Sequence, residues 1–190
     1  MQPKLTKVNK MKKYIYIIII AVLAFFIGQS IYQQINKTSA KASRLECHKN
    51  STVFEKVLKP KLLSRLQNDI KNGKIKVNIN IEKAKYMESK LFNFVDPQNV
   101  KKEFEDLIKK KTSIDSISSN VDILIYENDK NDPGKKTQKS KLYAGYLVFS
   151  FKVDKKLVYK LQIDFHDHQG KDIRKVLECA LESVQTIKNN

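Results

Sequence analysis

Glycine, proline and tryptophan are scarce in this chain of 190 residues, which has five glycines, four prolines and no tryptophan. Loops that cradle phosphate need closely spaced glycines, and the chain contains neither a Walker loop nor a G-x-G-x-x-G motif. The G-x-S-x-G elbow of serine hydrolases and the H-E-x-x-H motif of zinc peptidases are also missing. We therefore expect a non-enzymatic protein, with no catalytic residues and no cofactor.

Arginine is scarce as well, since Arg44, Arg65 and Arg174 are the only arginines in a chain with a formal net charge of +17. Arginine is the residue that makes bidentate contacts with phosphates and base edges. The lysines are spread over every polar segment and form no stripe interleaved with aromatic residues. We interpret the basic charge as a solvated surface and do not expect nucleic acid as a partner.

One long apolar run is present near the N-terminus. Residues 14–27 contain no charged side chain, and the thirteen residues before them carry five lysines and no acid. Residues 14–32 are uncharged throughout, and 19 helical residues span about 30 Å, enough to cross a bilayer. The pattern predicts a basic cytosolic tip (1–13), a transmembrane or signal-anchor helix (14–32), a polar tether (33–46) and an exported domain (47–190).

Cleavage of this segment is the alternative. Small residues flank two potential cleavage sites, Gly28-Gln29-Ser30 and Ala40-Lys41-Ala42, so a mature chain beginning near residue 31 or 43 is the competing prediction. Both alternatives place the domain outside the cytoplasm.

The chain has two cysteines, Cys47 and Cys179, at opposite ends of the exported domain. In an oxidising compartment, an even and widely spaced pair predicts one disulfide that joins the two ends. The alternative is a pair of buried thiols that pack as small apolar side chains.

The order of the predicted elements indicates an α+β fold. Alternation of apolar and polar residues predicts strands over 75–82, 121–127, 142–153 and 157–165. Apolar residues at helical spacing predict helices over 60–72, 97–108 and 173–187. We expect a mainly antiparallel sheet of four strands with about three helices on one face, and the other face solvated or offered to a partner.

Asp164, His166 and His168 are the most suggestive chemical group, although weak candidates for a metal site. In an extended chain the three side chains share one face, and carboxylate and imidazole are ligands of zinc. A complete site needs a further ligand, and His48 is the only other histidine. The structural alternative is a solvated strand end that leads into a turn.

The sequence thus predicts a single-pass protein of the cell (inner) membrane, with its N-terminus in the cytoplasm and an α+β domain outside. Its expected partners are the lipid bilayer, through residues 14–32, and a protein outside the cytoplasm, as for an accessory part of an envelope assembly. The alternative is a cleaved, periplasmic or secreted basic protein that binds an anionic ligand or acts as an effector.

Overall fold

The computed structural model describes residues 44–49, 51–109, 118–135 and 142–188 of the chain. The predicted tip, the apolar helix 14–32 and most of the tether lie outside these residues, as does the stretch that holds both cleavage sites. Within the described ranges, no helix is both long and apolar enough to cross a membrane.

The described part of the chain folds into one α+β domain with a single sheet. Its strands are β1 (Val53–Val57), β2 (Ile75–Glu82), β3 (Ser119–Glu127), β4 (Gly145–Val153) and β5 (Lys156–Phe165). Its α-helices are α2 (Pro60–Lys71), α3 (Pro97–Leu107) and α4 (Ile173–Thr186), and two short 3-10 helices, η1 (Glu46–His48) and η2 (Leu91–Asn93), complete it. The predicted class and the three helices are confirmed.

The prediction of a four-stranded sheet was wrong, because the sheet has five strands in the order β1-β5-β4-β3-β2. It is a mixed sheet: β2 runs parallel to β3, and the other neighbours are antiparallel. Strand β1 was not predicted because its polar and apolar residues do not match its two sides. The charged Glu55 lies on its inner side and the apolar Phe54 on its outer side. Glu55 is tolerated there because its carboxylate accepts a 2.6 Å hydrogen bond from the Tyr159 hydroxyl.

Capping residues fix where two of the helices begin and end. Asp96 precedes α3 and accepts a 2.9 Å hydrogen bond from the backbone N–H of Gln98, and Pro97 occupies the first turn. After α2, Gly73 adopts a φ of 67°, a left-handed conformation that glycine reaches without strain.

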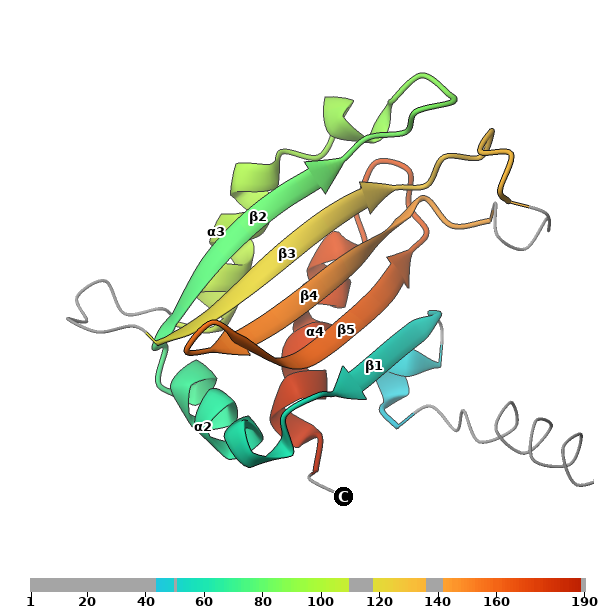
Figure 1. Cartoon of the computed structure of the whole chain (residues 1–190). Helices are drawn as coiled ribbons and strands as arrows, with labels where there is room; N and C mark the ends of the chain where they lie inside the picture. Colours follow the sequence, from blue (N-terminus) through green and yellow to red (C-terminus); the bar gives the residue numbers. More distant parts are fainter. Residues whose placement is uncertain (1–43, 50, 110–117, 136–141, 189–190) are drawn as a thin grey trace, which may run out of the picture. The chain divides into compact units, whose positions relative to one another are not determined.

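All three α-helices pack on one side of the sheet. Figure 1 shows α3 and α4 behind the strands and α2 at their lower end. The core between the two layers is apolar and aromatic, and the ring centroids of Phe104 in α3 and Phe149 in β4 lie 5.8 Å apart. No helix among the described residues covers the front of the sheet, so the side chains of that face are available to a partner.

Candidate functional site

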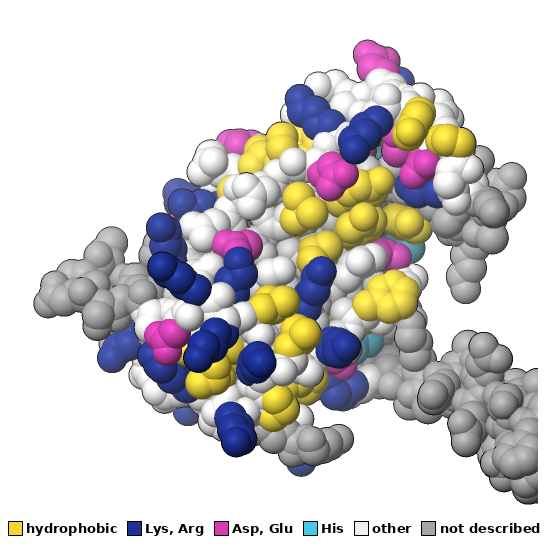
Figure 2. Space-filling view, in the orientation of Figure 1, with side chains coloured by type: hydrophobic (Ala, Val, Ile, Leu, Met, Phe, Trp, Pro, Cys, Tyr) yellow, Lys and Arg dark blue, Asp and Glu magenta, His cyan; other side chains and the backbone are white. Residues whose placement is uncertain are grey.

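The uncovered side of the sheet, which we call the open face, is defined by strand alternation. In β3 every second residue from Ser119 is buried, so the side chains between them point away from the helices. The open face consists of Phe54, Lys56, Lys76, Asn78, Asn80, Glu82, Asn120, Asp122, Leu124, Tyr126, Tyr146, Val148, Ser150, Lys152, Lys160, Gln162 and Asp164. Figure 2 looks onto this face and shows apolar side chains among lysines.

The middle of the open face is apolar. Leu124 of β3 lies directly opposite Val148 of β4, which in turn lies opposite Gln162 of β5. Phe54 of β1 continues this row on the other side of Gln162 and is 52% exposed. Large apolar side chains held in the solvated face of a sheet are typical of contact surfaces.

Tyr126 and Tyr146, at one end of the open face, and Tyr143, just before β4, form a group that we call the tyrosine cluster. The rings of Tyr126 and Tyr146 are stacked with centroids 4.3 Å apart, and the Tyr143 ring lies 6.4 Å from that of Tyr146. The ammonium group of Lys135 lies 5.7 Å and 5.9 Å from the Tyr126 and Tyr143 ring centroids, within cation–π range. Burial raises the pKa of all three hydroxyls, so they stay protonated and can donate hydrogen bonds at neutral pH.

The other end of the open face is basic. Exposed Lys56 and Lys160 lie directly opposite each other on neighbouring strands, and like charges in that position repel. Asp122 accepts hydrogen bonds from Asn78 at 2.7 Å and Lys152 at 2.5 Å. Although burial acts to raise the pKa of Asp122, these contacts outweigh it and hold the carboxylate ionised. Because Lys56 and Lys160 (the lysine pair) repel each other, an anionic group of a partner would be stabilised between them at this end of the open face.

A buried acid fixes the loop that follows β2. Glu127, the last residue of β3, accepts backbone N–H bonds from Ala84 at 3.2 Å, Lys90 at 2.8 Å and Leu91 at 2.9 Å. Burial alone would raise the pKa of Glu127, but the Ser89 side chain and these three amides outweigh it and lower the pKa. The carboxylate is thus an internal anchor for residues 83–91, which we call the anchored loop.

A second acid extends this anchoring. Asp129 accepts backbone N–H bonds from Lys85 at 2.7 Å and Tyr86 at 2.6 Å. Burial acts to raise its pKa as well, but these amides, the N–H of Asn131 and the charge of Lys135 lower it overall. Two ionised carboxylates therefore fix the anchored loop, mainly through its main-chain N–H groups.

This anchoring predicts a loss of stability in acid. A carboxylate with a lowered folded pKa stabilises the fold fully above its ordinary value, 4.5 for Glu127 and 3.8 for Asp129, and loses that contribution as pH falls through the folded pKa. We expect the thermal denaturation temperature to fall between about pH 5 and about pH 3. Glu127→Gln should cost about 1.5–3 kcal/mol at pH 7 and flatten the acid loss. Equal pH profiles for the two proteins would contradict the assignment of Glu127 as an anchor.

The structure does not gather the predicted metal ligands. β5 ends at Phe165, so the alternation that would align the three side chains stops before the histidines. Asp164 is buried on the open face, His166 is exposed, and His168 Nε2 lies 3.2 Å from the ammonium group of Lys130, which repels a cation. Metal binding by Asp164, His166 and His168 stays a prediction that this geometry does not favour.

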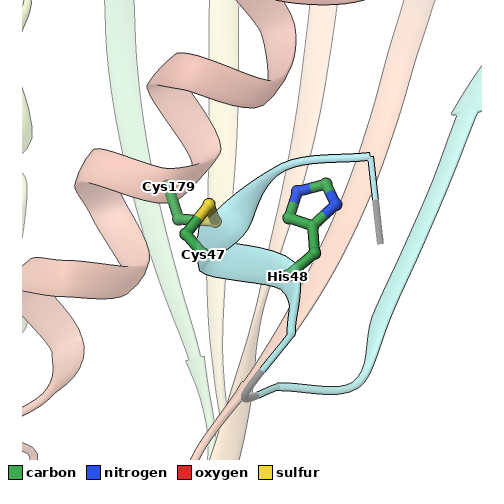
Figure 3. A group of neighbouring side chains, drawn as sticks. All are labelled: Cys47, His48 and Cys179. Carbon is green, nitrogen blue, oxygen red and sulfur yellow. A yellow bond between two sulfur atoms is a disulfide. The ribbon is translucent and has the colours of Figure 1, made fainter. Parts of the chain in front are cut away.

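The two cysteines form the predicted disulfide. Cys47 in η1 and Cys179 in α4 have sulfur atoms 2.06 Å apart, and 132 positions separate them in sequence. The His48 ring lies beside this bond (Figure 3), and its Nε2 lies 2.8 Å from the hydroxyl oxygen of Ser183. Cys179, His48 and Ser183 are buried, so the disulfide closes the N-terminal end of the domain onto α4.

Sequence reasoning missed the lysine pair, the tyrosine cluster and the two acid anchors. The lysine pair and the Tyr126–Tyr146 stack depend on strand register, which one sequence does not define. Glu127 did leave a signal, because it continues the inward series of Val121, Ile123 and Ile125. An acid at an inward position of a strand predicts a buried carboxylate with specific partners.

Comparison of the chain with models of protein families, with curated proteins and with solved structures gives no match. The features of the chain that bear on its function are therefore the geometry of the open face and the apolar N-terminal run.

Proposed function

We propose that the chain is a non-enzymatic, single-pass membrane protein that presents residues 47–190 outside the cytoplasm, and that the open face docks an acidic protein partner there. The observation that carries the proposal is the combination on one uncovered face of an apolar centre, a tyrosine cluster and a repelling lysine pair.

The tyrosine cluster supports a protein as the partner. Tyrosine is enriched at energetic centres of interfaces because it buries a large apolar surface and still offers a hydroxyl. Tyr126 and Tyr146 hold each other in place by stacking, so little side-chain freedom is lost when a partner covers them. Leu124 and Val148 extend this ordered surface across the middle of the sheet.

The lysine pair supports an acidic partner. An acidic group placed between Lys56 and Lys160 relieves their repulsion, and Lys76 adds a further exposed positive charge to the same face. A second copy of the chain fits less well, because subtracting the five tip lysines from +17 still leaves +12 on each copy.

The membrane part of the proposal depends on the uncharged segment 14–32 and the five lysines before it. It predicts that the full chain stays with membranes after a carbonate wash and keeps its unprocessed mass. A wholly soluble protein that begins near residue 31 or 43 would overturn the anchor and favour the cleaved, secreted alternative.

Site-specific crosslinking in native cells tests the docking surface. A photo-reactive phenylalanine analogue in place of Val148, in the middle of the open face, should yield one discrete crosslinked protein species. The same analogue in place of exposed Gln185, on α4, is the matched control and should not yield it. Introducing Lys160→Glu together with the Val148 analogue should weaken the crosslink by about tenfold or more, because a rim or surface charge that meets a like charge repels the partner.

Two results would contradict the docking surface. One is the same crosslinked species from Val148 and Gln185, and the other is a Val148 crosslink that Lys160→Glu leaves unchanged. Circular dichroism of each variant distinguishes a lost partner from a lost fold.

A further inference from the structure

Cys47, His48 and Cys179 form the one group of potential metal ligands that the described ranges bring together. One donor atom from each residue lies within 4.8 Å of the other two. His48 and Cys179 are buried, and Cys47 is partly buried, so the group is shielded from water. Figure 3 shows both cysteines and the imidazole at the meeting point of η1 and α4.

Two thiolates and an imidazole are a ligand set that zinc prefers. Zinc binds sulfur at about 2.3 Å and imidazole nitrogen at about 2.0–2.1 Å, so the donors of a tetrahedral site lie roughly 3.5–3.8 Å apart. The imidazole donor lies within 4.8 Å of both sulfurs, so it exceeds that spacing by about 1 Å at most. The two sulfurs are 2.06 Å apart in the disulfide and would separate by roughly 1.7 Å, once reduced, to reach it. We infer that the chain with both thiols reduced binds one zinc ion through Cys47, His48 and Cys179.

Zinc binding and the disulfide are alternative states of the same two sulfurs. When zinc binds, each thiol loses its proton, and two thiolates bind one Zn²⁺ with the release of two protons. When a disulfide oxidant acts, the two thiolates lose two electrons and form the Cys47–Cys179 bond, and zinc leaves. The oxidant's own disulfide bond breaks as it takes up the two electrons, and with two protons from water it becomes a dithiol. The reduced state needs no added reductant, because every chain is made with free thiols.

The groups that neighbour His48 and Cys47 are compatible with zinc binding. The Nε2 atom of His48 has a hydroxyl partner in Ser183, a weak competitor that zinc can replace. A carboxylate oxygen of Glu182 lies 3.9 Å from the Cys47 sulfur and can complete the coordination in place of water. Zinc would join η1 to α4 before oxidation as the disulfide does afterwards.

Zinc titration of the full-length chain in detergent, with a phosphine reductant and a chromophoric competitor chelator, tests this inference. The reduced chain should bind one zinc ion, and the oxidised chain none at this site. Cobalt in place of zinc should give a sulfur-to-metal charge-transfer band. His48→Asn and Cys47→Ser should each weaken zinc binding by about 100-fold or more, since the loss of outer-shell partners alone costs 10–100-fold.

His166→Asn is the matched control, because it removes an exposed histidine outside the cluster, and it should leave zinc binding unchanged. Circular dichroism verifies that each variant is folded. A reduced wild-type chain without zinc or without the cobalt band would overturn the inference. So would full affinity in His48→Asn, or a loss of affinity in His166→Asn.

Discussion

Replacing Cys47 and Cys179 with alanine is expected to lower the free energy of unfolding by about 2–5 kcal/mol. The disulfide joins residues 132 positions apart, and closing a loop of that length stabilises a fold by about 5 kcal/mol in the chain-entropy model. Urea denaturation of the oxidised wild-type chain and the double variant, both with a metal chelator, measures the difference.

The same experiment has an internal control. A thiol reductant should lower the stability of the wild-type chain to about that of the double variant and leave the variant unchanged. If the reductant shifts neither protein, the Cys47–Cys179 bond does not stabilise the fold.

Gly145→Ala should lower the free energy of unfolding by about 3 kcal/mol or more. A Cβ atom at Gly145 would lie 2.2 Å from the backbone oxygen of Tyr126 and 2.5 Å from Cζ of Phe165. The oxygen belongs to the neighbouring strand β3 and cannot rotate away, so β3 and β4 would have to separate. Because Tyr126 and Tyr146 stack across these strands, their contact should be lost as well.

Gly134→Ala is the matched control for this substitution. The three atoms nearest to a Cβ atom at Gly134 all belong to the flexible side chain of Asp132, the nearest at 3.2 Å, and we expect a change within about 0.5 kcal/mol. Thermal denaturation of both variants measures the contrast. Equal losses would show that the close approach at Gly145 is not what limits the substitution.

The sequence predicted the elements whose periodicity matches their burial. The alternation in KIKVNINIE predicted a strand over 75–82, and β2 has those bounds. Asp96 and Pro97 marked the beginning of α3, because capping needs only local residues. These elements could be predicted because their apolar side chains are mostly buried and their polar side chains mostly face the solvent.

The features that escaped prediction depend on contacts between distant segments. β1 was missed because its inner side includes Glu55, whose carboxylate has a partner 104 positions away. The open face needs the register of five strands, and its lysine pair exists only because β1 lies beside β5. The parallel pairing of β2 with β3 likewise follows from how α3 returns the chain to the sheet.

The position of the disulfide decides how the domain carries a mechanical load. Cys47 precedes the edge strand β1, so tension on the chain from its N-terminal side reaches α4 through the covalent bond to Cys179. Without that bond, the same tension would reach β1 first and unzip its hydrogen bonds to β5 from one end. In a domain held at its N-terminus, the disulfide therefore transmits the force to helix α4, and the edge strand β1 is shielded from it.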